Sequence, residues 1–125
     1  MSNQITDTFI QNCPVRNILA HICGKWSLLV IYVMHQNDNI RFNALNRAIP
    51  DISQKVLTST LRSLEADGFV TRQVYAEVPP RVEYSLTARA RSFIPVVENM
   101  IAWAQSNMTE ILKDRNKKTI EAKWQ

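Results

Sequence analysis

Residues 53–68 carry side chains whose types and spacing suit contact with a nucleic acid. Three leucines at +4 and +3 spacing define one face of a helix: Leu57, Leu61 and Leu64. The first turn and the other face offer an amide, cations and hydroxyls: Gln54, Lys55, Thr58, Ser59 and Arg62. Such cations bind DNA phosphates, and such polar groups hydrogen-bond base edges in the major groove. An ordinary amphipathic helix with a solvated face has the same pattern, so the helix alone leaves both interpretations open.

The sequence also marks where this helix begins and ends. Ser53 is a candidate N-cap, because its side chain can accept a hydrogen bond from an amide of the first turn. The capping box is incomplete, since Val56 stands where Glu or Gln would complete it. Gly68 is a natural stop signal. A helix between Ser53 and Gly68 is therefore predicted.

A shorter helix is expected just before this one. After a short extended segment at residues 40–41, its apolar residues are Phe42, Leu45, Ala48 and Ile49. Pro50 disfavours helical geometry at the residue before it, so the chain turns through residues 51–52. Two helices joined by a tight turn form a helix-turn-helix pattern. Arg41 and Arg47 are expected to contact the DNA backbone.

A β-hairpin is predicted after the longer helix. Residues 70–75 and 81–86 alternate apolar and polar side chains. The two prolines within residues 76–80 cannot donate ladder hydrogen bonds, so this segment is a loop. Arg72 and Arg81 lie on the hairpin, where an arginine can reach a phosphate or a narrow minor groove. Two solvent-facing arginines are the alternative, but the helix and hairpin together place the cations on one docking surface.

Three further helices are expected around this motif. Pro14 opens a short helix, in the first helical position that proline favours, and Gly24 ends it. Residues 25–35 leave almost no polar face and should form a central buried helix. A long last helix follows Thr87, its candidate cap, and Pro95 should kink it or mark its first turns.

The last helix carries an apolar stripe at +4, +3, +4 and +3 spacing: Val97, Ile101, Ala104, Met108 and Ile111. A stripe of this length packs either on a second copy of the same helix or on the core of its own chain. From Lys113 onward the sequence is polar and basic, and we expect it to fray.

Five runs occur in a characteristic order: GKW, RFNAL, IPDISQKVLT, LRSLEADGFV and VYAEVPPRVEYSLT. In order and spacing they are similar to the HxlR-type winged-helix transcription regulators, relatives of the MarR group, over about residues 13–103. The resemblance implies a mainly α fold with a small β-hairpin, a winged helix-turn-helix with an extended C-terminal dimerisation helix. It also implies a homodimer on a double-stranded, inverted-repeat DNA operator, with residues from Ser53 onward in the groove and a wing around residues 79–81.

The resemblance also implies a division of the chain. Residues 1–12 would be an N-terminal arm, residues 13–108 the regulator domain, and residues 109–125 a basic tail to which the family assigns no role. The N-terminal segment and the last helix would form the dimer interface, at Val97, Ile101, Ala104 and Met108. Cys23 departs from the family, in which glycine is more usual at this place.

Cys13 is a candidate redox switch. It stands at a helix N-terminus before Pro14 and near Arg16, and both a helix N-terminus and a nearby cation lower the pKa of a thiol. By resemblance, several members of the family sense oxidants or electrophiles through a cysteine in this position. An inert thiol near the dimer interface is the alternative. Cys23 is expected to be a small buried residue at a helix end.

Composition excludes several classes of protein. The chain has 125 residues, 46% of them hydrophobic, which suits one compact domain. Only two glycines are present, and the GxGxxG, P-loop, HExxH and GxSxG motifs are absent, so neither an enzyme nor a cofactor is expected. The spacing of Cys13, His21 and Cys23 matches no standard zinc site, so no metal is expected.

The remaining alternatives concern the partner. The net charge of +4 permits a nucleic acid but does not require one. A winged-helix regulator controlled by a small-molecule ligand, or a protein-interaction module that does not bind DNA, would share much of this pattern. Because the polar N-terminus lacks the features of a signal peptide and no apolar stretch approaches eighteen residues, we expect a cytoplasmic protein without a membrane segment.

Overall fold

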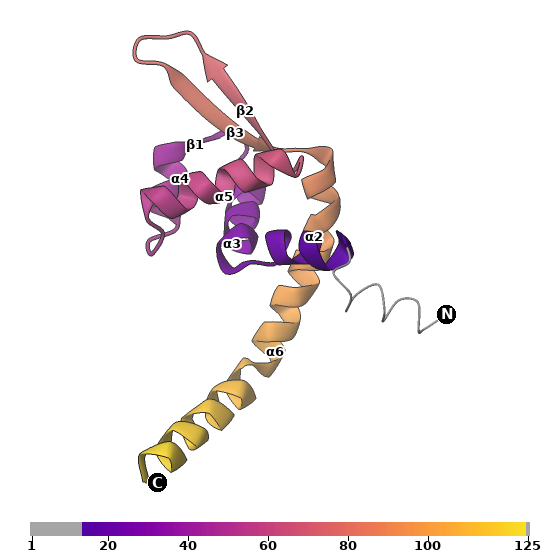
Figure 1. Ribbon diagram of the computed structural model, residues 1–125, viewed down its shortest axis with the longest axis vertical. Coiled ribbons are helices and arrows are strands. Elements are labelled where there is room, and N and C mark those ends of the chain that lie inside the picture. Colours follow the sequence, from indigo (N-terminus) through magenta and orange to yellow (C-terminus); the bar gives the residue numbers. More distant parts are fainter. Residues whose placement is uncertain (1–13, 125) are drawn as a thin grey trace, which may run out of the picture. The chain divides into compact units, whose positions relative to one another are not determined.

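The computed structural model describes residues 14–124, with side chains as far as residue 118. Its helices are α2 (Pro14–Ile22), α3 (Lys25–Gln36), α4 (Phe42–Ala48), α5 (Gln54–Ala66) and α6 (Ala88–Trp124), and its strands are β1 (Ile40–Arg41), β2 (Val70–Tyr75) and β3 (Arg81–Leu86). The chain divides into two compact units between Ile94 and Pro95, within α6. Figure 1 shows that the β2–β3 hairpin extends beyond the helices of the first unit.

The core of the first unit is built mainly by α3 and α5. Helix α3 buries Val30, Ile31 and Met34, and α5 buries the three leucines predicted from their spacing, Leu57, Leu61 and Leu64. The prediction of a buried helix over residues 25–35 is therefore confirmed for one face of α3. Its other side is more open than expected, since Leu29 is 43% exposed.

Local side-chain and backbone signals fix both ends of α5. The Ser53 hydroxyl accepts a hydrogen bond of 3.1 Å from the amide of Val56, so the predicted N-cap is confirmed. Gly68 has φ +78°, in the left-handed region that favours glycine. The amide of Phe69 donates to the carbonyl of Leu64 at 2.8 Å, which closes the last turn of the helix.

The sheet has three antiparallel strands in the order β1-β3-β2. The hairpin has the bounds that alternation predicted, and its register pairs Val70 with Leu86 and Tyr75 with Arg81. The segment expected only to be extended, β1, pairs with β3 and sets Arg41 opposite Glu83. This pairing ties the start of the helix-turn-helix to the hairpin.

Helix α6 is longer than its sequence suggested. The Thr87 hydroxyl accepts a 3.3 Å hydrogen bond from the amide of Ala90, which confirms it as the cap. The helix continues through Pro95 to Trp124, so the prediction that the chain frays from Lys113 is wrong. The residues from 113 onward include Lys and Glu, which are good helix formers, and this propensity outweighs the polarity that suggested fraying.

The second unit exposes several large apolar side chains of α6: Val96, Met100, Trp103, Met108, Ile111 and Leu112. Of the predicted interface residues, Val97 is buried, Ile101 is partly exposed, and Ala104 and Met108 are exposed. Among the helices of residues 14–124, none taken alone has the length and apolar content needed to cross a bilayer, although α2 and α3 reach that threshold as a pair bent by 63°.

Candidate nucleic-acid interface

The outward face of α5 brings together most of the polar residues that the sequence singled out. They line one open hollow with Phe42 of α4: Gln54, Lys55, Thr58, Ser59 and Arg62. Thr58 is partly buried, and the other four polar residues are exposed. The buried leucines on the opposite face fix the rotation of the helix, so this polar side must point outward.

The cations on this face are available for an external anion. Within residues 14–118, no ion pair or hydrogen bond engages the side chain of Lys55 or that of Arg62. An exposed cation without a protein partner can bind a phosphate without first breaking an internal contact. The α5 face therefore has the chemistry needed to bind a polyanion.

Arg72 extends this surface onto the hairpin. It is exposed on β2, and a second hollow between α5 and the sheet is lined by Thr58, Leu61, Arg62, Glu65, Arg72 and Tyr84. Arg62 and Arg72, ten residues apart in sequence, thus face the same hollow. The hairpin lies beside α5 as a wing lies beside a recognition helix.

Arg81 is in a different state from the other predicted contact residues. Its Nη1 lies 3.3 Å from Glu77 Oε1, and its Nε lies 3.4 Å from Glu83 Oε2. Its guanidinium also stacks over the Tyr75 ring, with Cζ 4.1 Å from the ring centroid. The side chain is only 28% exposed. The cation at the base of the wing tip is therefore held by the hairpin itself.

The two carboxylates that hold Arg81 are not among the residues predicted from the sequence. Glu77 stands four residues before it across the loop, and Glu83 stands two residues after it on the same face of β3. The alternation of side chains along β3 could have indicated the pair of Arg81 with Glu83. The pair of Arg81 with Glu77 depends on how residues 76–80 fold back. Arg41 shares a third hollow with Arg81, between the start of α4 and the wing tip.

Two other predicted contact residues lie apart from these three hollows. Arg47 is exposed in the last turn of α4. The Ser53 hydroxyl is occupied as an acceptor by the cap of α5, although it keeps a proton to donate.

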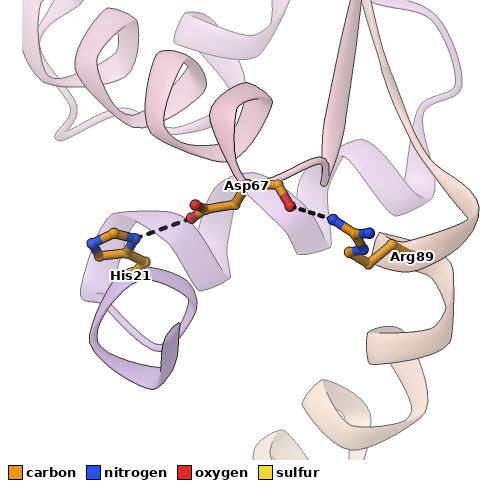
Figure 2. Close-up of polar contacts among 3 residues, drawn as sticks. All are labelled: His21, Asp67 and Arg89. Atoms are coloured by element: carbon orange, nitrogen blue, oxygen red, sulfur yellow. Dashed lines mark hydrogen bonds and ion pairs between the residues drawn. The ribbon is translucent and has the colours of Figure 1, made fainter. Parts of the chain in front are cut away.

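The structure bears on only some of the predictions made for the cysteines and for His21. Cys13 lies outside the described residues. The prediction that Cys23 is buried is wrong: its thiol is free and exposed, because Ile22 takes the inward position at the end of α2. His21 Nδ1 lies 3.2 Å from the Asp67 carboxylate (Figure 2). Within the described part of the chain, no cluster of three or more His, Cys, Asp or Glu residues could hold a metal ion.

Helix α2 adds an apolar surface to the first unit. Val15 is 49% exposed, Ile18 is 55% exposed and Leu19 is 38% exposed. They share one face by their spacing, and none of the described residues, 14–118, covers that face. A contiguous apolar face of this kind marks a contact surface.

A helix-turn-helix followed by a β-hairpin wing, with a polar, cationic outward face on the second helix, defines a winged-helix protein. Comparison with known proteins narrows this class. Residues 21–112 match the HxlR-like helix-turn-helix family, and the chain belongs to it. It is a transcriptional regulator of the HxlR and MarR type, a family of regulators and not of enzymes.

Individual relatives agree with this assignment. The HTH-type transcriptional regulator BH0655 of Halalkalibacterium halodurans is 44% identical over 98 residues, which are 78% of this chain and 87% of BH0655. The redox regulator HypR is similar in its oxidized form (48% identity, TM-score 0.69, 76% of this chain and 97% of HypR). Its reduced form is also similar (46% identity, TM-score 0.72, 81% of this chain and 98% of HypR). The regulator YtfH of Salmonella typhimurium has a TM-score of 0.77 at 34% identity, covering 86% of this chain and 96% of its own.

Proposed function

We propose that this protein is a sequence-specific, double-stranded DNA-binding repressor that acts as a homodimer on an inverted-repeat operator. The outward face of α5 is the observation that carries the proposal, because it combines hydroxyls and an amide with cations that no described residue pairs, beside a wing. Phosphate contacts set the register of such a helix, and its base contacts supply specificity. The similar regulators come from bacteria and an archaeon, in which DNA lies in the cytoplasm, and we propose that this regulator acts there.

Each residue on the proposed interface has a role suited to its chemistry. Gln54, in the first turn of α5, can pair bidentately with adenine. Lys55 and Arg62 suit phosphate or guanine, and Thr58 and Ser59 can reach either a base edge or a phosphate. Three exposed arginines outside α5 would contact the backbone: Arg41, Arg47 and Arg72.

A second copy of this chain is the proposed partner for the uncovered apolar surfaces. These lie on α2, at Val15, Ile18 and Leu19, and on α6, at residues such as Trp103 and Met108. Removing exposed apolar area of this kind from water contributes roughly 25 cal/mol per Å², which offsets the freedom that the two chains lose on association. A two-fold dimer would present two α5 helices to half-sites about 34 Å apart, one turn of DNA.

Footprinting over the promoters adjacent to the gene of this protein tests the function. The expected result is protection of an inverted repeat whose half-sites are about 10 bp apart. Binding should weaken steeply with salt, since each phosphate contact adds about one unit to the slope of log affinity against log salt concentration. An absence of both protection and retention on heparin at low salt would contradict DNA binding.

An oxidant or electrophile acting through Cys13 is the proposed signal. HypR, a redox regulator solved in oxidized and reduced forms, shares 48% identity with this chain. The test is titration of DNA binding with diamide in the wild type, in Cys13→Ser and in Cys23→Ser. Loss of the response in Cys13→Ser alone is expected. Identical responses in all three proteins would rule out Cys13 as the required sensor, and a small-molecule inducer would then be the alternative signal.

A further inference from the structure

Residues 67–69, directly after α5, are hydrogen-bonded to the first turn of α6. Arg89 Nη1 donates to the carbonyl of Asp67 at 2.8 Å. Thr87 donates twice, from its hydroxyl to the carbonyl of Gly68 at 2.6 Å and from its amide to the carbonyl of Phe69 at 3.0 Å. Three consecutive carbonyls at the end of α5 are thus bound by two residues at the start of α6.

Asp67 also connects this segment to α2. His21 Nδ1 lies 3.2 Å from Asp67 Oδ2, across 46 positions in sequence. Figure 2 shows Asp67 between the two partners, with its carboxylate directed at His21 of α2 and its carbonyl directed at Arg89 of α6. One residue at the end of α5 therefore contacts two other helices of the first unit.

Gly68 and Phe69 make the connection close-packed. A Cβ at position 68 would lie 2.5 Å from Arg89 Nη1 and 3.3 Å from Arg89 Cζ, so the guanidinium fills the space that a side chain would need. Phe69 is 7% exposed, and its ring meets that of Phe93 edge to face at 6.1 Å. Position 68 thus requires glycine for its positive φ and also for the approach of Arg89.

We propose that residues 67–69 are an orienting junction, in which Arg89 and His21 are positioning residues that set the angle of α5 for DNA. The proposal depends on the DNA-binding function proposed above. The 13 residues of α5 span about 20 Å at 1.5 Å per residue, so a tilt of about 5° at the junction would move its first turn by about 2 Å. Gln54 and Lys55 lie in that first turn. Contacts at the far end of α5 therefore control where its DNA-facing residues lie.

The contacts that His21 and Arg89 make with Asp67 are too exposed to contribute much to stability. The His21 side chain is 56% exposed and that of Asp67 is 31% exposed, and exposed ion pairs contribute about 0–1 kcal/mol. Their loss should leave the protein folded and change the orientation of α5. This separates the proposed role from a purely structural one.

A matched pair of variants tests the junction, Arg89→Ala and Arg91→Ala. Both remove one exposed cation from the first turns of α6, but only Arg89 contacts residue 67. The first readout is hydrogen exchange of the amides of residues 67–69 in the free protein. These amides are bonded to carbonyls of α5. Exchange several-fold faster in Arg89→Ala than in Arg91→Ala is expected.

The second readout is affinity for a duplex that the wild type selects from a library of random DNA. Arg89→Ala should weaken binding by about threefold or more relative to Arg91→Ala, with the same salt slope as Arg91→Ala, because no phosphate contact differs between them. Arg89→Lys, which keeps one donor, should restore part of the affinity. His21→Ala should act in the same direction, and His21→Gln should restore part of the loss.

Each outcome decides between the proposals. Equal behaviour of Arg89→Ala and Arg91→Ala in DNA binding would overturn the junction, whether or not hydrogen exchange differs between them. A salt dependence of binding that is weaker in Arg89→Ala than in Arg91→Ala would also overturn it, since Arg89 would then be a phosphate ligand. If the wild type selects no duplex from the library, the DNA-binding proposal itself fails.

Discussion

Helix α5 and the tip of the hairpin wing carry their cations in opposite states. Lys55 and Arg62 are exposed on α5 and, among the described residues, have no ion-pair partner. Arg81, on the wing, is paired with two carboxylates and stacked on an aromatic ring. The two elements also differ in how many side chains they bury. Helix α5 buries three leucines, whereas β2, the first strand of the wing, buries only Val70.

The difference shows that the presence of an arginine on a docking surface does not make it a DNA ligand. A phosphate that approaches Arg81 meets Glu77 and Glu83 as well, and it must replace them before it gains a contact. Arg81 does have a local use, since a two-stranded hairpin is marginally stable by itself and its contacts join the loop to both strands. In the proposed complex with DNA, α5 and Arg72 would supply affinity, and the tip of the wing would supply shape.

The largest expected effect tests the difference in side-chain burial between α5 and the wing. Leu57→Ala removes a fully buried side chain from α5 and should lower the free energy of unfolding by about 2–5 kcal/mol. Val78→Ala at the wing tip, where the side chain is fully exposed, should change it by less than about 0.5 kcal/mol. Urea denaturation measures both. Similar losses from the two variants would show that the wing tip is packed more firmly than its exposure indicates.

The second prediction concerns the two arginines directly. Arg62→Ala should weaken operator binding by about 1–3 kcal/mol, since it removes an unpaired cation from the α5 face. Arg81→Ala should also weaken binding, but by less, because that guanidinium is already engaged. Dissociation constants at fixed salt, with circular dichroism as the control for folding, measure the two effects. An Arg81→Ala loss equal to or larger than that of Arg62→Ala would remove the distinction between helix and wing.

The third prediction concerns the start of α5. Ser53→Ala deletes the hydroxyl that accepts from the Val56 amide and should lower stability by about 1 kcal/mol. Ser59→Ala, in the exposed middle of the same helix, is the control and should be neutral or slightly stabilising, since alanine is the better helix former. Thermal unfolding of the two variants measures this difference. Equal melting temperatures would mean that the cap contributes nothing.

The smallest expected effect has the opposite sign. Glu77→Gln keeps the shape of the side chain, removes one of the two carboxylates beside Arg81 and should tighten DNA binding by about twofold, within the range of an exposed ion pair. Glu110→Gln makes the same change of charge on α6 and controls for net charge. The measurement is the dissociation constant at low salt. Weaker binding in Glu77→Gln than in Glu110→Gln would show that Glu77 orders the wing for DNA and does not mask Arg81.

Local patterns in the sequence predicted much of the fold and the composition of the candidate site. Leucine spacing gave the buried face of α5, and Ser53 and Gly68 gave its ends. Alternation gave both hairpin strands at their observed bounds. These features depend on residues within a few positions of one another, so periodicity and capping residues are sufficient to predict them.

The tertiary structure decided which of the predicted groups are free and which are engaged. The pairing of β1 with β3, the contact of His21 with Asp67 and the capture of Arg81 by Glu77 depend on how separate segments approach one another. A free arginine and a paired arginine are the same residue in the sequence, so the sequence does not distinguish them. Whether a cation can bind DNA is set by the carboxylates that folding brings within about 4 Å of it, and only the folded chain shows where those carboxylates lie.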